Sequence, residues 1–338
     1  MTSSSADPST RGTLLLARRD VAALLDLDDC IAAVEDTLRL HADGRTLPQG
    51  VVGIPAGDGG FHIKASGLKT GRTWFAAKCN SNFADNASRF GLPLIQGLVL
   101  LFDAENGRPL AVIDSIEITI LRTGAATAVA AKHLARDDSR VATICGCGNQ
   151  GRVQLRSLTR VRRLERVFAF DAYPAQAVSF AGEMGAELGI AVHAVTDLTA
   201  AVSQSDICVT CTPAKSYFLR AEDVRPGTFV AGVGADNEQK QELDPRLFAG
   251  AKVVVDSLEQ CATIGDLHHA LEQGTTTRAR VHGELAQLVA GLKPGRTSPE
   301  EITLLDSTGI ALEDVAAAIV VYQRAVERGT GRFLDFGT

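Results

Sequence analysis

The sequence has no long hydrophobic run and no surplus of positive charge. Its apolar stretches are short, as at Gly97–Phe102, whereas a membrane-spanning helix needs about 18 or more apolar residues. Lys and Arg total 34 against 40 Asp and Glu, which gives a net charge of −6. Proteins that bind nucleic acids or anionic membranes usually carry a basic patch or stripe. We therefore expect a soluble protein that binds neither a nucleic acid nor a membrane.

A secretion signal and a cysteine framework are also missing. Residues 1–12 contain neither a basic segment nor an apolar one, which predicts a loose tail and a cytoplasmic protein. The seven cysteines are an odd number, and several lie in apolar segments, where cysteine acts as a small hydrophobic residue. Cys208 and Cys211 have CxxC spacing, but no second pair lies at the spacing of a zinc site. We therefore expect no metal.

The first part of the chain has the pattern of an antiparallel sheet. With 338 residues, 45% of them hydrophobic and 22% charged, the chain is long enough for two folded domains. Ile31, Val34 and Leu38 have helical spacing, and strand-like segments follow. These strands are expected at Val51–Ile54, Gly60–Leu68, Thr73–Asn80, Gln96–Phe102 and Pro109–Ile113. A turn at 105–107 makes the last two a hairpin.

The second part alternates strands with helices, after a long helix expected from Ser115 to Leu134. Helices are expected from about Gly151, over Pro174–Leu188 and over Leu198–Gln204. The strands between and after them are expected at Val141–Cys145, Val167–Asp171, Ala191–Val195, Ile207–Thr212, Phe229–Val233, Val253–Asp256 and Thr303–Leu305. This alternation predicts an α/β fold with a doubly wound parallel sheet. A last helix is expected over 312–328, and it could pack on either part.

A glycine fingerprint points to the cofactor. Gly146, Gly148 and Gly151 form GxGxxG directly after a predicted strand and at the start of a helix, and Asp171 ends the next strand. The first glycine allows a tight turn, the second lets the backbone approach a pyrophosphate, and the third lets helix and strand pack closely. The helix N-terminus adds N–H groups and a positive dipole. We therefore predict a Rossmann-type domain that binds a nicotinamide dinucleotide, with Asn149 and Gln150 in its binding loop.

Asp171 bears on which dinucleotide is bound. A carboxylate at this position accepts hydrogen bonds from the ribose hydroxyls and repels a 2′-phosphate that has no compensating Arg. Arg152 and Arg166 are the two cations that could fold toward it. We predict NAD as the cofactor.

Four basic residues of the first part are candidates for holding a substrate carboxylate. They are Arg45, Lys64, Lys78 and Arg122. Lys78 and Arg122 lie in apolar surroundings, where a cation that only faces solvent is less expected. A hydride-transfer enzyme needs such cations because a misplacement of about 1 Å costs on the order of 100-fold in rate.

Six segments together resemble the ornithine cyclodeaminase/mu-crystallin family, in order from about residue 20 to 330. They are Arg45, Phe75–Lys78, Asp114–Thr127, Gly146–Gly151, Gly232–Asp236 and Ser307–Asp314. The resemblance implies a substrate-binding and dimerisation domain of α+β type over 13–125 and 312–338, a Rossmann domain over 126–311, and a homodimer formed through the first domain's sheet. It also implies that Arg45, Lys78 and Arg122 hold the substrate carboxylate.

The resemblance further implies that Asp236 lies beside the reacting carbon and nitrogen. The residue itself agrees with this, because a loop at the carboxyl end of a Rossmann strand is where ligands meet an open sheet. We predict Asp236 and Lys78 as catalytic residues. The predicted cofactor contacts also include Thr212, Pro213, Gly234, Ser307 and Gly309. Asp314 is interpreted as a structural acid that complements its helix dipole.

A metal site is not expected at the histidines. His268 and His269 are adjacent, so their side chains should point to different faces, and the pair His282 and Glu284 is the other candidate. The family resemblance implies no metal.

These observations predict an NAD-dependent oxidoreductase that moves hydride to or from the Cα of a small amino or imino acid. A ketimine or cyclic-imine reductase and an amino-acid dehydrogenase such as alanine dehydrogenase both fit. The alternatives are an ornithine cyclodeaminase, which retains NAD and releases ammonia, and a mu-crystallin-like binding protein. Ornithine cyclodeaminases offer a carboxylate to the distal ammonium in the strand before Lys78, whereas this chain has His62 and Lys64 there. A cation at that place predicts against ornithine.

Overall fold

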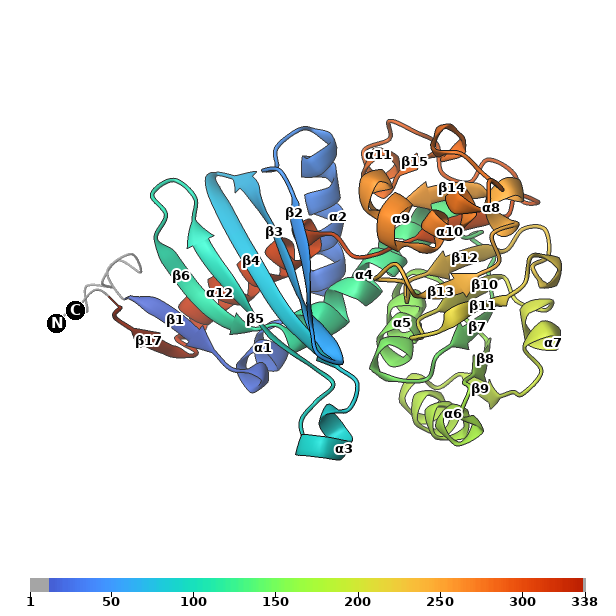
Figure 1. The fold of residues 1–338 in the computed structure, drawn as a ribbon, viewed down its shortest axis with the longest axis horizontal. Helices are drawn as coiled ribbons and strands as arrows, with labels where there is room; N and C mark the ends of the chain where they lie inside the picture. Colours follow the sequence, from blue (N-terminus) through green and yellow to red (C-terminus); the bar gives the residue numbers. More distant parts are fainter. Residues whose placement is uncertain (1–11, 337–338) are drawn as a thin grey trace. The chain divides into compact units, whose positions relative to one another are not determined.

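The computed structural model describes residues 12–336, which form two units (Figure 1). The first unit contains the residues up to Arg122 and those from Ile310 onward, and the second runs from Thr123 to Gly309. Helix α4 (Ile116–Leu134) crosses from one unit into the other. The tail expected over 1–12 lies outside the described residues apart from Gly12. Among residues 12–336, no helix has both the length and the apolar character of a membrane span.

The first unit is built on a seven-stranded sheet in the order β17-β1-β6-β5-β4-β3-β2. Its strands are β1 (Thr13–Leu16), β2 (Gly50–Ala56), β3 (Gly59–Thr70), β4 (Arg72–Phe83), β5 (Ile95–Asp103), β6 (Pro109–Asp114) and β17 (Arg332–Leu334). The expected antiparallel pairing from β2 to β6 is present, including the hairpin between β5 and β6. The sheet is not wholly antiparallel, however, because β1 pairs with β6 in parallel.

Helices cover one face of this sheet. They include α1 (Arg18–Leu24), α2 (Leu27–Ala42) and α12 (Ala311–Arg328), whereas the short α3 (Asn86–Phe90) lies in the connection between β4 and β5. Helix α12 packs on β3, β4 and α2, and the even-numbered residues at the centres of β3 and β4 are buried toward it, as the two-residue period of a strand requires. The opposite face keeps large apolar side chains exposed.

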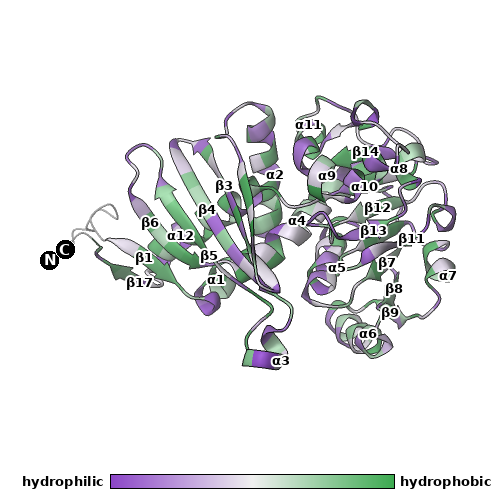
Figure 2. Cartoon of the chain, viewed as in Figure 1, coloured by the Kyte–Doolittle hydropathy of each residue, from purple (hydrophilic) through white to green (hydrophobic). Residues whose placement is uncertain are grey.

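The second unit has an eight-stranded, wholly parallel sheet in the order β15-β14-β16-β12-β10-β7-β8-β9. Its strands are β7 (Val141–Cys145), β8 (Arg166–Phe170), β9 (Ala191–Ala194), β10 (Ile207–Thr210), β12 (Phe229–Gly232), β14 (Lys252–Val255), β15 (Gly283–Glu284) and β16 (Thr303–Asp306). Strands β10, β12 and β16 are buried throughout, as expected of parallel strands covered on both faces. In Figure 2, the ribbon of β12 has the hydrophobic colouring expected of such a strand. The predicted doubly wound sheet is confirmed.

Helices and a small second sheet complete this unit. The helices are α5 (Asn149–Val161), α6 (Pro174–Leu188), α7 (Leu198–Val202), α8 (Leu247–Gly250), α9 (Leu258–Ile264), α10 (Asp266–Glu272) and α11 (Leu285–Val289). Strands β11 (Lys215–Leu219) and β13 (Gln241–Leu243) pair in parallel with each other.

The order of the main sheet reverses between β7 and β10, so the loops after these strands diverge. Such a switch point is where open α/β sheets bind ligands.

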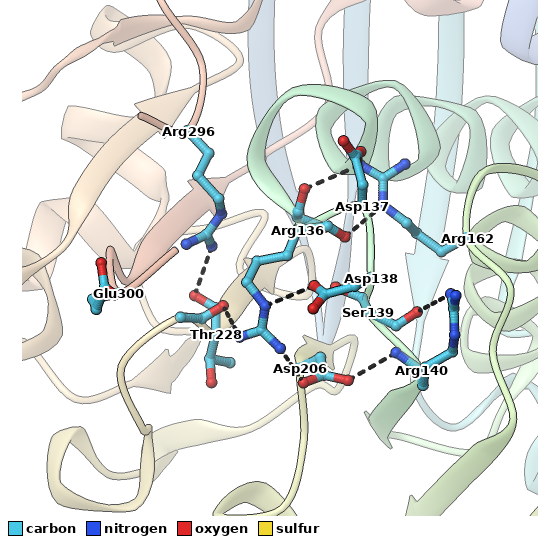
Figure 3. A network of polar contacts seen from close by, with 12 residues as sticks. Arg136, Asp137, Asp138, Ser139, Arg140, Arg162, Asp206, Thr228, Arg296 and Glu300 are labelled. Atoms are coloured by element: carbon cyan, nitrogen blue, oxygen red, sulfur yellow. Dashed lines mark hydrogen bonds and ion pairs between the residues drawn. The ribbon is translucent and has the colours of Figure 1, made fainter. Parts of the chain in front are cut away.

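A polar network fixes the amino edge of the main sheet (Figure 3). The Asp206 carboxylate accepts hydrogen bonds from the guanidinium groups of Arg136 and Arg225, each at 2.6 Å, and from the backbone N–H groups of Arg140 and Val141. Arg162 donates to the carbonyls of Ala131, in the last turn of α4, and of Ala135, just after it. This network holds the amino edge, at the opposite ends of the strands from the glycine loop.

Candidate functional site

Each glycine of the fingerprint has a distinct steric reason. Gly146 has a φ of +98°, and a Cβ there would lie 2.8 Å from the carbonyl oxygen of Cys211. A Cβ at Gly151 would lie 2.0 Å from the carbonyl oxygen of Gly146, so only glycine lets α5 pack this closely. A Cβ at Gly148 would meet no atom within 4 Å. The loop is therefore closed toward the protein and open at Gly148.

The start of α5 offers groups that fit a pyrophosphate. Gly148 is the N-cap, and Asn149 and Gln150 are the first two helical residues, so their N–H groups have no partner within the helix. The Oε1 atom of Gln150 is buried without a hydrogen-bond partner among the described residues. A helix N-terminus with free N–H groups and no acidic side chain in its first turn favours an anion. These residues fit NAD.

Asp171 lies beside the glycine loop, directly after β8. Its carboxylate accepts hydrogen bonds from the backbone N–H of Cys147 at 2.8 Å and from that of Tyr173 at 2.9 Å. Arg152 reaches the same loop, where it donates to the Cys147 carbonyl at 2.6 Å, but its charge is paired with Glu183 at 2.8 Å. Arg166 instead stacks on the Phe168 ring at 5.1 Å. Neither arginine makes an ion pair with Asp171.

A cavity of about 410 Å³ lies next to Phe170, the residue before Asp171. It is lined by Phe170, Thr196, Asp197, Leu198, Thr199, Phe218, Arg220 and Asp223. Its lining combines two aromatic rings and one leucine with five polar or charged side chains, which suits a flat base that carries hydrogen-bonding groups. None of these residues was proposed as a cofactor contact from the sequence. Thr196–Thr199 follow a predicted strand of the parallel sheet, and that position could have identified them.

The other predicted cofactor contacts surround two buried acids. The Glu242 carboxylate accepts hydrogen bonds from the backbone N–H groups of Thr212 and Gly234. The Asp256 carboxylate accepts from the Ser307 hydroxyl at 3.0 Å and from the Gly309 N–H at 2.6 Å. Neither acid was named as a site residue from the sequence, although Asp256 ends an apolar predicted strand. The polar residues around Glu242 give no sign of its burial. Pro213, beside Thr212, is exposed.

Asp236 lies on the loop after β12, as expected. Its carboxylate forms an ion pair with Lys240 at 2.7 Å and accepts a hydrogen bond from the Asn237 side chain at 3.2 Å. The side chain is 46% exposed. The group is therefore accessible and is held by a neighbouring cation.

In the first unit, the predicted basic residues meet two acids. Lys78 Nζ lies 2.7 Å from the Asp314 carboxylate. Arg122 pairs with Glu313 at 2.8 Å and with Asp314 at 3.2 Å. Lys64 is the direct cross-strand partner of Lys78 and is also buried. The structure thus brings Lys64, Lys78 and Arg122 together as one buried group of charges.

Asp314, interpreted from the sequence as a structural acid that complements its helix dipole, has contacts beyond the helix. Asp314 lies in the first turn of α12, as expected, and it is also buried and bridges Lys78 and Arg122. Glu313 was missed altogether. The signal that could have found both is a pair of adjacent acids within a helix face that is otherwise apolar.

Arg45 differs from the other predicted cations. It is exposed, and its guanidinium donates a hydrogen bond to the backbone carbonyl of Lys69 at 3.0 Å. The described hydrogen bonds and ion pairs do not link it to the buried group.

Burial controls the protonation of this group. It lowers the pKa of Lys78 to about 7, with the positive charges of Arg122 and Lys64 acting in the same direction and Asp314 opposing them. Burial alone would raise the pKa of Asp314, but the charges of Lys78 and Arg122 bring it below its usual value. Lys78 is therefore able to hold an anion when protonated and to exchange a proton near neutral pH.

The side chains of two adjacent histidines were expected to point to different faces, but their rings lie close together. The rings of His268 and His269 lie 4.8 Å apart, and together with Glu272 they form a group whose potential ligand atoms lie within 4.8 Å of one another. His268 contacts Glu272 at 3.2 Å, and His269 Nε2 lies 2.9 Å from the Lys240 carbonyl oxygen. The Nε2 atoms of both histidines thus have protein partners, whereas the Nδ1 atom of His268 is buried without a hydrogen-bond partner among the described residues.

Comparisons with known proteins identify the family of the chain. Residues 11–329 match the model of the ornithine cyclodeaminase/mu-crystallin family. Iminosuccinate reductase of Paracoccus denitrificans is 33% identical over 332 residues, covering 95% of this chain and 99% of that protein.

Two solved structures are similar over nearly the whole chain. The Δ1-pyrroline-2-carboxylate reductase of Thermococcus litoralis, in complex with NADH and L-proline, is 34% identical with a TM-score of 0.91, and covers 95% of this chain and 100% of that one. An archaeal alanine dehydrogenase dimer with bound NAD is 37% identical with a TM-score of 0.91, and covers 96% and 99%. The chain described here belongs to the ornithine cyclodeaminase/mu-crystallin family.

Proposed function

We propose that the buried basic residues of the first unit hold the carboxylate of an amino or imino acid, and that the second unit holds NAD. The protein is an NAD-dependent oxidoreductase that transfers hydride to or from the Cα of such an acid, the activity class of its named reductase and dehydrogenase relatives. NAD supplies the group that accepts or returns the hydride.

The buried group of charges is the observation that carries the proposal. Lys64, Lys78 and Arg122 lie together with Glu313 and Asp314 in this buried group. Buried cations are stabilised by anions beside them, and a substrate carboxylate is an anion of the kind that three gathered cations favour. Lys78 and Arg122 bind that carboxylate in this proposal, with Arg45 and Lys64 assisting.

Proton handling is assigned to two residues. Asp236 stabilises the iminium that forms as hydride leaves Cα, or exchanges the proton on its nitrogen. Lys78, with its pKa near 7, is the second catalytic group.

The cofactor is held by the glycine loop and the loops at the switch point. Gly146, Gly148 and Gly151 shape the pyrophosphate site, Asn149 and Gln150 line it, and Asp171 accepts hydrogen bonds from the ribose hydroxyls. The further contacts come from Thr212, Pro213, Gly234, Ser307 and Gly309. The cavity beside Phe170 takes the adenine.

The substrate side chain is neutral or acidic in this proposal. Lys64 lies on the same face of the sheet as Lys78, where it disfavours an ammonium group. The alternatives are an ornithine cyclodeaminase and a mu-crystallin-like binding protein. One panel of assays separates the three: NADH oxidation with 2-oxo acids plus ammonia or amines and with cyclic imines, NAD reduction with amino acids, and ammonia release from ornithine. Ammonia and proline formed from ornithine without net NAD reduction would contradict the proposal, and NADH binding without turnover of any substrate would favour the binding protein.

A homodimer is also part of the proposal. The face of the first unit's sheet opposite to α12 exposes Val52, Ile54, Phe61, Leu98 and Leu100, each at least 38% exposed. A continuous apolar face of this kind marks a protein interface. Sedimentation should give a dimer, and Leu98→Glu should weaken it; a monomeric wild-type protein would contradict this assignment.

A cytoplasmic location belongs to the same proposal. All seven cysteines are free thiols, which suits a reducing compartment. Cell fractionation would test it, and recovery of the protein outside the cytoplasm would count against it.

A further inference from the structure

Glu242 joins two loops of the second unit. It lies on β13, is fully buried and accepts four hydrogen bonds. Its Oε1 atom accepts from the Thr212 backbone N–H at 2.6 Å and from the Thr212 hydroxyl at 2.7 Å. Its Oε2 atom accepts from the Thr210 hydroxyl and from the Gly234 backbone N–H, each at 2.8 Å.

The partners of Glu242 come from the carboxyl ends of two neighbouring strands. Thr212 follows β10, and Gly234 follows β12, which pairs directly with β10. A Cβ at Gly234 would lie 2.5 Å from Glu242 Oε2, so the second loop packs tightly on this carboxylate. The loop then continues to Asp236. One side chain therefore fixes the spacing of both loops at the edge of the sheet where ligands bind.

We propose that Glu242 is a positioning residue that holds the loops after β10 and β12 in the arrangement that binds NAD. The inference rests on the proposed cofactor-binding role of these loops. Glu242 acts through Thr212 and Gly234 and needs no contact with NAD or the substrate.

The chemistry of the four bonds requires a carboxylate of this length. Backbone N–H groups can only donate, so those of Thr212 and Gly234 each need an acceptor. Glutamine at position 242 has one acceptor oxygen and an NH2 group. In either orientation, one of the two N–H groups would therefore face a donor. Aspartate keeps both oxygens but is one methylene shorter, so it cannot span the two loops as Glu242 does.

Protonation of Glu242 would disturb the same bonds. The titratable groups that act on it are Asp266 at the start of α10 and the buried thiols of Cys145 and Cys211. Burial, reinforced by the charge of Asp266, raises the pKa of Glu242 to about 7. Burial also raises the pKa of Asp266 to about 6 and holds the pKa of both thiols well above the usual range, so the thiols stay neutral. A proton on Glu242 removes an acceptor position, and we expect the loops to loosen as pH falls through 7.

NADH binding in the absence of an amino acid tests the proposal, with NADH fluorescence as the readout. Glu242→Gln should weaken NADH binding at pH 8 about tenfold or more, which is about 1.4 kcal/mol. Wild-type affinity should fall between pH 8 and pH 6, whereas that of Glu242→Gln should change little. The matched control is Asp244→Asn. Asp244 is a buried acid two residues along, and it accepts from the N–H groups of Ala221 and Arg246 rather than from either loop. This variant should keep wild-type affinity.

Several results would overturn the inference. Glu242→Gln that is folded by circular dichroism and binds NADH as tightly as wild type would do so, and so would equal losses in Glu242→Gln and Asp244→Asn. If Glu242→Gln does not fold, the wild-type titration and Glu242→Asp provide the test: affinity independent of pH, or full binding by the aspartate variant, contradicts a role in spanning the loops. Wild-type protein that binds no NADH at all would overturn the proposed function and this inference with it.

Discussion

Lys64 and Lys78 are direct cross-strand partners on β3 and β4, and both side chains are buried on the face of the sheet that packs against α12. Like charges at directly opposite positions destabilise a sheet. The structure offsets this with Asp314, which lies 2.7 Å from Lys78 and whose pKa is also lowered by the charge of Lys64. An anion bound beside the two lysines would offset the repulsion between them further.

This pairing predicts that ornithine is a poor substrate. At an effective dielectric of about 20, two unit charges 4 Å apart repel by roughly 4 kcal/mol. We expect kcat/KM for ornithine to be at least about 100-fold below that for the best substrate with a neutral or acidic side chain. Lys64→Gln should narrow the gap, as measured by initial rates with both substrates.

The matched control for Lys64 is Lys69→Gln. Lys69 lies on the same strand but is exposed, so its loss should leave the ratio of the two kcat/KM values unchanged. Proline and ammonia produced from ornithine at ordinary enzyme rates, with NAD needed only in catalytic amounts, would show that the reductase assignment is wrong.

The pKa of Lys78 predicts how substrate binding depends on pH. Because burial lowers this pKa to about 7, Lys78 is mostly protonated below pH 7 and mostly neutral above it in the free protein. Only the protonated form attracts a carboxylate, so KM for the acid substrate should rise as pH increases from 6 to 9. Lys78→Arg stays charged over this range, and its KM should be nearly independent of pH. Parallel KM profiles for the two proteins would contradict the assignment of Lys78 to the carboxylate.

The sequence predicts buried cations more readily than it predicts their partners. Lys78 could be singled out because its neighbours Phe75, Ala76 and Ala77 are apolar. Its partner Asp314 lies 236 residues away. The apolar residues around Asp314 in α12 indicate that it is buried, but no local signal identifies the cation that it meets. The structure identifies Asp314 as the partner of Lys78, because α12 packs against β3 and β4.

Strand register is a second feature of the site that the sequence alone does not determine. A shift of one residue turns every side chain of a strand to the opposite face, so the alternation of polar and apolar residues around Lys64 leaves two orientations open. Pairing of Lys64 with Lys78 selects one of them. By contrast, β7 and α6 have the predicted bounds, because a compact apolar run and a helix between Pro174 and Gly189 are signals contained in the segments themselves.

Arg122 is predicted to be essential for substrate binding but not for NADH binding. Charge-assisted hydrogen bonds contribute roughly 1.5–3 kcal/mol each, so Arg122→Ala should lower kcat/KM about 10- to 100-fold or more. The variant also leaves Glu313 and Asp314 without one cation, so a lower melting temperature is expected. Arg122→Lys keeps the charge but cannot reproduce both contacts of the guanidinium. Its kcat/KM should therefore lie between that of the wild type and that of Arg122→Ala. Unchanged turnover in the alanine variant would refute the role.

Asp171 is predicted to set the preference for NAD over NADP. Its carboxylate would repel a 2′-phosphate, and Arg152, the cation that reaches the same loop, is paired with Glu183. Asp171→Ser should therefore reduce the ratio of kcat/KM for NADH to that for NADPH. Some loss with NADH itself is expected, because the variant also loses the acceptor for the N–H groups of Cys147 and Tyr173. Wild-type protein that uses NADPH as well as NADH would contradict this interpretation of the acid.

Asp236 is predicted to act in proton transfer or in stabilising the iminium. General acid–base groups typically contribute 10²- to 10⁴-fold to the rate, so Asp236→Asn should lower kcat by about that factor while NADH binding stays intact. The amide retains the shape of the side chain and an acceptor for Asn237 but loses the ion pair with Lys240. Lys240→Met, which breaks the same ion pair and leaves the carboxylate in place, is therefore the matched control and should lose much less activity. Equal losses in the two variants would mean that the ion pair, which shapes the loop, accounts for the lost activity and that the carboxylate itself does not act on the substrate. A loss below about threefold in Asp236→Asn would show that Asp236 is an ordinary surface residue.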